Sequence, residues 1–142
     1  MTNELTTEFV LYHSTATGQG CADCHDILRE ARARNARLHL TGYLHQEDGR
    51  YYQWLEGPAA ELAEVMALIL SDPRHRDVHY LRSGAQAERK FGGWAMCFGL
   101  TSAGSFFDWV AEYGTSLRSE EKFADALLKF MLSDAVRQSA RA

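Results

Sequence analysis

The sequence is poor in proline and cysteine and has no long apolar run. Only Pro58 and Pro73 occur among 142 residues, where a helix start and a turn are predicted. Three cysteines cannot close a disulfide framework, which favours a reducing compartment. Apolar stretches such as residues 65–70 are too short to cross a bilayer, and the first residues lack the pattern of a secretory signal. We therefore expect a cytoplasmic protein without a membrane partner.

An excess of positive charge is also missing. Lys and Arg total 15 against 19 Asp and Glu, which gives a formal net charge of −4. This balance argues against a basic surface for DNA or RNA, and we expect no nucleic-acid partner. With 46% hydrophobic and 24% charged residues, the composition is that of an ordinary globular protein. A chain of this length can bury a core without disulfides.

Hydrophobic periodicity predicts alternating strands and helices over the first hundred residues. The predicted strands cover residues 9–14, 38–45, 51–56, 78–82 and 93–99, and the predicted helices cover 22–35 and 58–71. An Asp48-Gly49 turn joins the two middle strands. The order βαββαββ predicts a ferredoxin-like α+β fold, in which two helices cover one face of a mixed five-stranded sheet. The last strand would carry Trp94, Met96 and Phe98 on one face.

The other face of this sheet needs a cover, because Tyr52 and Trp54 would leave a large aromatic patch in water. The tail contains two amphipathic segments that carry aromatic and aliphatic side chains. These are Phe106, Phe107 and Trp109 in the first segment, and Phe123, Leu127, Phe130 and Met131 in the second. We predict a domain over residues 1–100 and a helical pair over 101–142 that docks on the second sheet face.

Two strings near residue 20 imitate cofactor motifs. Cys21 to His25 matches the attachment motif of c-type haem, but that chemistry belongs to exported chains, and Cys24 falls on the apolar helix face. A redox Cys-x-x-Cys pair stays an alternative to a core cysteine beside a solvent-facing one. Gly18-Gln19-Gly20 resembles the start of a dinucleotide loop, but Asp23 at the third glycine position would repel phosphate.

Known catalytic templates are absent from the sequence. It has no Gly-x-Ser-x-Gly elbow, no Walker loop and no His-Glu-x-x-His, and its six histidines are scattered. We therefore expect no enzymatic turnover.

Three uncharged polar side chains fall among apolar neighbours: Tyr12 on the first strand, Asn35 on the first helix and Gln53 on the third strand. An unsatisfied buried amide costs roughly 1–3 kcal/mol, so these groups need partners. Either they bond one another in a structural network, or they hold a flat heterocycle such as an isoalloxazine. The residues alone leave both interpretations open.

Six segments in order resemble the BLUF family, the blue-light sensors that use flavin adenine dinucleotide. The segments are Val10–Ser14, Ile27–Asn35, Leu40–Leu44, Tyr51–Pro58, Asp72–His75 and Arg89–Met96. Together they span the first hundred residues, and the family's fold is the ferredoxin-like layer predicted above. The chain departs from the usual pattern at Tyr51, which replaces a phenylalanine, and it has larger residues at His39, Tyr43, His45 and Trp54.

The resemblance implies a role for each matching residue. Tyr12 would donate an electron and a proton, Gln53 would be the switching amide between Tyr12 and the flavin, and Asn35 would hold the edge of the ring. Ile27 and Leu28 would lie against the ring. Candidates for the ribityl and phosphate chain are Arg34, Asp72, Arg74 and His75. Trp94 and Met96 would pass the signal to the sheet and the tail.

The expected protein is therefore a short, single-domain blue-light photoreceptor with non-covalent FAD, for which FMN is a possible substitute. It would signal to an unidentified downstream protein or through a change in a homo-oligomer. Three alternatives compete with this interpretation: a flavin-dependent redox enzyme, a c-type haem electron carrier, and an interaction module without flavin.

Overall fold

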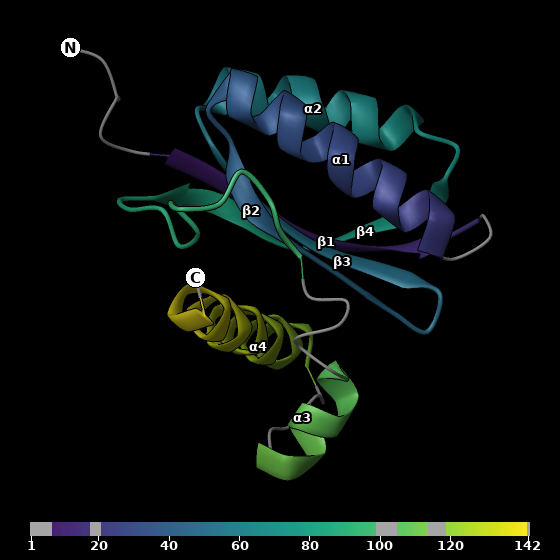
Figure 1. The fold of residues 1–142 in the computed structure, drawn as a ribbon, viewed down its shortest axis with the longest axis vertical. Coiled ribbons are helices and arrows are strands. Elements are labelled where there is room, and N and C mark those ends of the chain that lie inside the picture. The colour runs from purple at the N-terminus through teal and green to yellow at the C-terminus, as the bar shows by residue number, and fades with distance from the viewer. Residues whose placement is uncertain (1–6, 18–20, 99–104, 114–118, 142) are drawn as a thin grey trace.

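The computed structural model of the chain describes residues 7–17, 21–98, 105–113 and 119–141 (Figure 1). The elements follow one another as strand β1 (Thr7–Ala16), helix α1 (Cys21–Leu38), strands β2 (Thr41–Glu47) and β3 (Arg50–Gly57), helix α2 (Ala59–Ser71), strands β4 (His75–Gln86) and β5 (Cys97–Phe98), and helices α3 (Phe106–Tyr113) and α4 (Glu120–Arg141). The predicted order of elements is confirmed.

The sheet has the strand order β4-β1-β3-β2-β5. Its four long strands pair antiparallel, whereas β5 adds only two residues, parallel to β2. The prediction of a full fifth strand over residues 93–99 is therefore wrong. The Trp94 amide donates to the Phe91 carbonyl at 3.0 Å, and this turn through Gly92 and Gly93 replaces the first part of the expected strand. Residue 99 lies outside the described part of the chain.

Local sequence signals explain the middle hairpin and the second helix. Asp48 and Gly49, between β2 and β3, both have positive φ, which is the backbone that a two-residue hairpin turn requires. Pro58 precedes α2 as its extended N-cap residue. The predicted apolar stripe of α2 is buried: Leu62, Val65, Met66 and Ile69. Burial of such a stripe supplies most of a helix's stability in a protein of this size.

The boundary between α1 and β2 differs from the prediction. The helix continues to Leu38, and the strand begins only at Thr41. His39 between them has a φ of 61°, a left-handed conformation that ends a helix, and the Leu40 amide bonds back to the Asn35 carbonyl at 2.9 Å. The apolar run from Leu38 had suggested a strand three residues too early.

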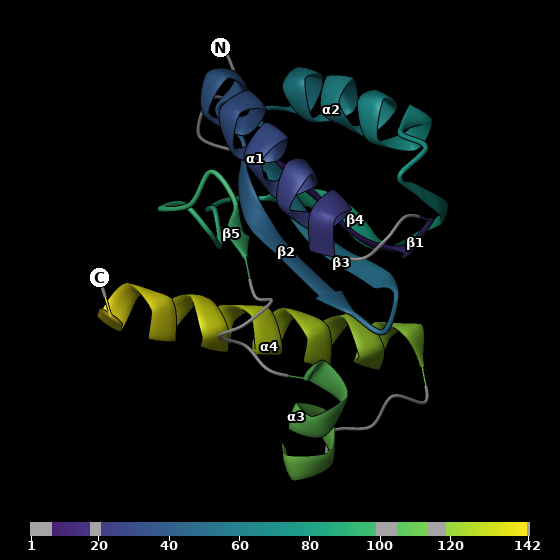
Figure 2. The same ribbon diagram turned by 45° about the vertical axis from the view of Figure 1, so that its right-hand side comes forward.

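The two faces of the sheet carry separate cores. Helices α1 and α2 cover one face, and α4 lies across the other (Figures 1 and 2). Strand β3 alternates as predicted: Tyr51 and Leu55 belong to the core under α1 and α2, while Tyr52 and Trp54 belong to the core under α4. The alternation places Gln53 on the α1 and α2 side.

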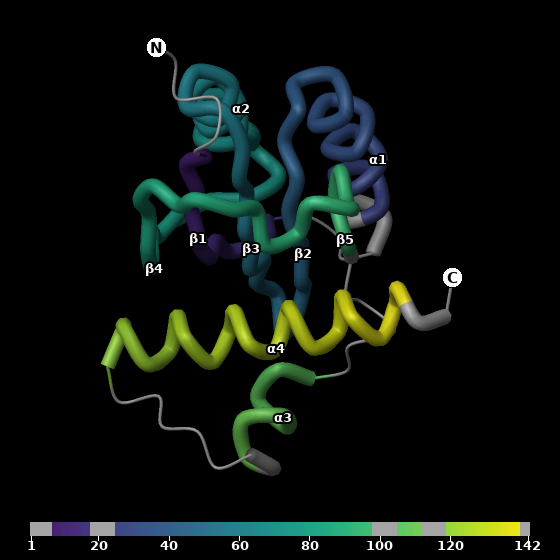
Figure 3. Tube along the Cα trace, turned by 90° about the vertical axis from the view of Figure 1, so that its left-hand side faces the viewer, coloured from purple at the N-terminus to yellow at the C-terminus, as the bar shows by residue number. Residues whose placement is uncertain are grey.

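The predicted docking of two tail helices on the second face is correct for α4 and wrong for most of α3. Helix α3 lies beyond α4, on the side away from the sheet (Figures 2 and 3). Two of its residues belong to the core under α4: Phe106, whose ring lies 6.3 Å from that of Tyr52, and Val110. Within the described residues, no helix combines the length and the apolar character needed to cross a bilayer.

Candidate functional site

Tyr12 and Gln53 form a buried hydrogen-bonded pair. They lie opposite each other in the register of β1 and β3, and both point to the α1 and α2 side. Their exposed fractions are 2% and 4%. The Tyr12 hydroxyl donates to the Gln53 Oε1 atom, and the Gln53 Nε2 group donates to the Met96 sulfur at 3.8 Å. One amide thus accepts at one end and donates at the other.

Burial keeps the phenol of this pair neutral. Desolvation raises the pKa of Tyr12 well above its usual range, and only the Arg34 charge opposes this rise. Tyr12 is therefore a proton donor toward Gln53 over all ordinary pH values. Arg34 belongs to the same environment, since burial lowers the pKa of its guanidinium while Tyr12, Glu30 and Asp72 raise it.

A small hollow of about 20 Å³ adjoins the pair. It is lined by Tyr12, Ile27, Leu44, Tyr51, Gln53, Asp72 and His75. Its volume is enough for one water molecule. A ring system at this position requires the lining side chains of α1 and of the segment after α2 to move apart.

Asn35 and Arg34 supply unpartnered polar atoms on α1. The Asn35 Nδ2 group donates to the Ala95 carbonyl at 2.9 Å, but its Oδ1 atom is buried without a partner among the described residues. The Nε atom of Arg34 is also buried without a hydrogen-bond partner among the described residues. A buried acceptor and a buried donor on adjacent residues fit a ligand that carries both kinds of group, as the edge of a flavin ring does.

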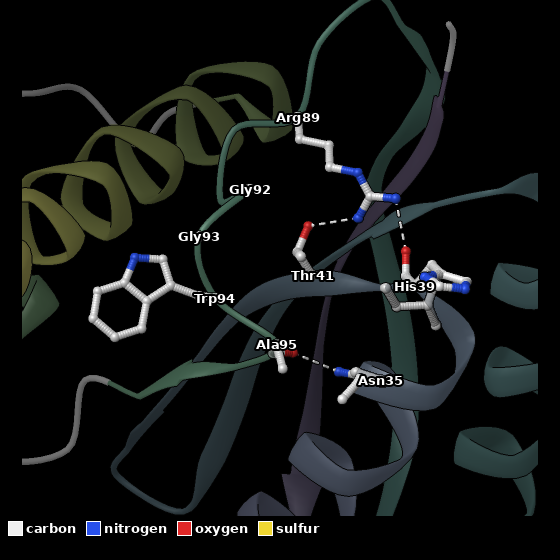
Figure 4. A pocket seen from close by; sticks show the side chains of 10 residues that line it. Asn35, His39, Thr41, Arg89, Gly92, Gly93, Trp94 and Ala95 are labelled. Atoms are coloured by element: carbon white, nitrogen blue, oxygen red, sulfur yellow. Dashed lines mark hydrogen bonds between the residues drawn. The ribbon is translucent and has the colours of Figure 1, made fainter. Parts of the chain in front are cut away.

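Asn35 makes no hydrogen bond to the Tyr12–Gln53 pair within the described structure. It lines a second, open pocket of about 280 Å³ together with Arg89, Trp94 and Ala95 (Figure 4). The three uncharged polar groups singled out by the sequence are thus brought together only in part. Two bond directly, and the third bonds the residue that precedes Met96.

Three of the predicted site residues follow α2 and already have partners. Arg74 bonds Asp72 and Glu30, each at 2.7 Å at the nearest, and the Arg74 hydrogen bonds lower the pKa of Asp72. The His75 Nε2 donates to the Ile69 carbonyl, so its Nδ1 accepts from Ser14. Asp72 and His75 line one side of the hollow, and the ion pair between Arg74 and Glu30 links their segment to α1.

Trp94 and Met96 do not share a strand face. Both precede β5, and they belong to opposite cores. Met96 is 1% exposed and packs with Tyr12 beneath α1 and α2, while Trp94 packs against the core under α4. The Trp94 indole points away from Asn35 in Figure 4. The expectation of a common face is wrong because the turn at residues 91–94 breaks the strand alternation.

The sequence analysis did not identify some residues of the site. Leu44 lines the hollow, Glu30 holds Arg74, and the Arg32 Nε donates to the Met96 carbonyl at 3.1 Å. Leu44 carried a signal, since alternation from the apolar residues of β2 places it on the helix side. No sequence signal pointed to Glu30 or Arg32, because charged residues on a helix are usually solvated.

The cofactor look-alike strings lie mostly outside the described parts. Residues 18–20 and the side chains of Cys21, Asp23 and Cys24 are not among those that the structure describes. Within the described residues, no group of three or more His, Cys, Asp or Glu side chains could hold a metal ion.

The fold, together with the buried Tyr12–Gln53–Met96 chain, has the features of a light-sensing flavoprotein domain. Residues 8–97 match the family described as sensors of blue-light using FAD, or BLUF. The chain belongs to the BLUF family. It is a blue-light photoreceptor that uses a flavin.

Solved structures and curated proteins agree with this assignment. BlrB, a BLUF protein in its dark state, is 25% identical with a TM-score of 0.76 over 92% of this chain and 98% of that chain. BlsA in its photo-activated state is 25% identical with a TM-score of 0.73 over 89% and 94%. Photoactivated adenylate cyclase subunit beta of Euglena longa is 35% identical over 91 residues, 63% of this chain and 11% of that protein. The chain thus spans about a tenth of that curated relative.

Proposed function

We propose that this chain senses blue light through FAD held beneath α1 and α2, with the Tyr12–Gln53–Met96 chain as its switch. The observation that carries the proposal is this buried chain of hydrogen bonds, in which a neutral amide links a phenol to a thioether. When bound, a flavin supplies absorption of blue light and, once excited, a strong oxidant. FMN is the alternative ligand, and a BlrP1 structure described with FMN is a relative of this chain.

Several residues would hold the flavin. Ile27 and Leu28 would contact the ring, and Arg34 and Asn35 would bond its polar edge. Arg34 and Asn35 support this role because each has a buried atom without a partner in the described structure. Asp72, Arg74 and His75 would reach the ribityl and phosphate chain. For Arg74 this requires exchange of its present carboxylate partners, which is feasible because Glu30 is half exposed.

Tyr12 would release an electron and its hydroxyl proton. Its position supports this role, since the hydroxyl is buried, neutral and already bonded to an acceptor. A phenol oxidised in water would lose its proton to solvent. In this site the hydroxyl proton lies on the hydrogen bond to the Gln53 Oε1 atom, the partner of this hydroxyl within the described part of the chain, which favours return of the electron and proton to Tyr12.

Gln53 would store the response. Its amide is neutral, so exchange of its donor and acceptor ends changes the bonding pattern without burial of a charge. In the present orientation the Nε2 end contacts Met96. Rotation would turn the oxygen to the Met96 sulfur, which has no hydrogen to donate, and would remove that hydrogen bond. A change at Tyr12 would thereby be passed to the segment before β5.

The output would run through β5, β2 and α4. Cys97 of β5 pairs with Tyr43 of β2, and the Tyr43 hydroxyl bonds Asp134 of α4. We propose residues 1–100 as the sensing domain and residues 101–142 as the extension that reports its state. The signal would pass to a separate cytoplasmic protein or alter a homo-oligomer, whereas the cyclase of the Euglena relatives is part of the same protein.

Spectroscopy of the purified chain loaded with FAD tests this proposal. Brief blue illumination should move the flavin absorption reversibly to longer wavelength, without loss of its intensity, and darkness should restore the first spectrum. Lasting bleaching, or a spectrum that light does not change, would contradict the proposal. Parallel loading with FMN decides between the two ligands.

A further inference from the structure

Glu56 is a buried carboxylate with five hydrogen-bond donors around it. It lies on β3 and is 0% exposed. The donors are Trp54 Nε1, Gln86 Nε2 and the Lys90 amide to Oε1, and the Thr41 hydroxyl and the Phe91 amide to Oε2, at 2.7 to 3.0 Å. An ionised carboxylate, which only accepts, is the group that such a shell of donors fits.

Two of these donors belong to the crossover, the segment of residues 87–96 that joins β4 to β5. These strands are the opposite edges of the sheet, so the crossover passes over the strands between them (Figure 3). It contains no helix or strand. Glu56 holds its early part by two backbone amides, and Arg89 adds bonds to Thr41 and to the His39 carbonyl at 3.0 and 2.7 Å (Figure 4).

The late part of the crossover ends beside the Tyr12–Gln53 pair. Met96 contacts Gln53, while the carbonyls of Ala95 and Met96 accept from Asn35 and Arg32 of α1. The path from Phe91 to Met96 is short, and two backbone hydrogen bonds stabilise it. The Trp94 amide donates to the Phe91 carbonyl, and the Gly42 amide donates to the Trp94 carbonyl at 3.2 Å. The place of Phe91 therefore limits where Met96 can lie.

We infer that Glu56 is a positioning residue for the photoreaction: its carboxylate fixes the start of the crossover and thereby holds Met96 against the Gln53 amide. This inference rests on the proposed switch of Gln53. Glu56 acts through the chain and touches neither Tyr12 nor the hollow. Its effect should appear in the return from the lit state, because the Glu56 hydrogen bonds oppose the movement of the crossover that brings Met96 back to Gln53.

Glu56→Gln is the direct test, because it keeps the shape of the side chain. With the new amide nitrogen at the Oε2 position, the Thr41 hydroxyl can rotate to accept from it. The Thr41 hydroxyl and the Phe91 amide both lose this acceptor, so one hydrogen bond replaces the two that Oε2 accepts in the unmodified chain. We expect the FAD-loaded variant to show the dark spectrum and the red shift of the unmodified chain. Its dark recovery should be about fivefold faster, because the barrier to recovery falls by roughly the free energy of one hydrogen bond.

Two further variants keep the test decisive. Thr41→Val removes the donor to Oε2 and the acceptor for Arg89 without a change of shape, and it should also recover faster, even if Glu56→Gln fails to fold. Glu88→Gln makes the same charge change at an exposed position of the crossover and should recover like the unmodified chain.

Recovery at the unmodified rate in both Glu56→Gln and Thr41→Val would overturn the inference, even with lower melting temperatures, because the carboxylate would then be only structural. Equal acceleration in Glu88→Gln would also overturn it. Absence of any red shift in the unmodified chain would instead refute the proposed function, so the two failures are distinguishable.

Discussion

The hydroxyl of Tyr43 on β2 donates a hydrogen bond to the Asp134 carboxylate of α4 at 2.5 Å, and both residues are fully buried. Gln138 donates to the same carboxylate oxygen at 2.6 Å, and Arg137 approaches the other oxygen at 3.3 Å. On the β4 side, Arg82 bonds Asp125 and His79 bonds Glu120 of the same helix, but those groups are partly exposed to solvent. The Tyr43–Asp134 contact is buried, so it constrains the position of α4 on the sheet most strongly.

Tyr43→Phe should lower the free energy of unfolding by about 1–3 kcal/mol, since it removes one donor from a buried carboxylate. For a chain of this size, each kcal/mol corresponds to a fall of roughly 2–6 °C in the melting temperature. Thermal unfolding followed by circular dichroism measures the change. Val136→Ala, at a position 68% exposed on the same helix, is the control and should change stability little. Equal effects of the two variants would contradict a specific role of the Tyr43 contact.

Tyr12→Phe and Gln53→Leu should each keep bound flavin and lose the light-induced red shift. Both substitutions keep the apolar body of the side chain and remove the hydrogen bond between the two residues. Absorption spectra before and after a blue pulse give the result. Tyr80→Phe is the matched control, because Tyr80 is 43% exposed and meets the Tyr12 ring only edge to face. A normal photocycle in either test variant would refute the assigned roles.

Periodicity predicted the faces of β3 correctly because alternation is a local property. The same rule failed at Trp94 and Met96, where a turn through two glycines precedes β5 and separates the two side chains. The course of that segment depends on Glu56, 34 and 35 residues earlier in the chain, and no local pattern reveals such bonds.

The tail shows a second limit of prediction. An amphipathic pattern indicates that one side of a helix is buried, but it does not say what covers it. For Phe130 the cover includes β2, since its ring lies 4.9 Å from that of His45. For Trp109 of α3 the cover is α4, through the same Phe130 ring at 5.9 Å.

The ion pair between Arg74 and Glu30 could not be predicted from the sequence for a related reason. The two residues are 44 positions apart, and no local pattern indicates that they meet.

Removal of the residues after 105 should make the chain aggregate. Helix α4 covers Leu11, Tyr52, Trp54 and Phe91, which are at most 1% exposed in the full chain. Without the cover they would form a contiguous apolar surface, which promotes association. Size-exclusion chromatography and light scattering of the truncated chain measure this outcome. A truncated chain that stays monomeric and photoactive would show that the tail is not needed as a cover.

Acidification should weaken the fold through His13. Its ring on β1 stacks on His79 of β4 at 5.1 Å, and His79 bonds Glu120 at the start of α4. Burial lowers the pKa of His13 below 6.5, the Arg50 and His79 charges lower it further, and Glu120 opposes them. The unfolded chain therefore binds more protons than the folded chain just below pH 6.5. The stability from His13 is complete above that pH and falls as the pH drops toward the folded pKa, by at most about 1.4 kcal/mol per pH unit.

Urea unfolding at pH 7.5, 6.5 and 5.5 measures this slope, and His13→Gln should reduce it because the variant has no proton to gain at that position. Val136→Ala, at an exposed position of α4, removes no titratable group and should leave the slope unchanged. The comparison isolates His13, since Arg50, His79 and Glu120 are present in every variant. If His13→Gln kept the full dependence on pH, the proton would be taken up elsewhere. The stacked histidines would then have no part in the acid response of the contact between the sheet and α4.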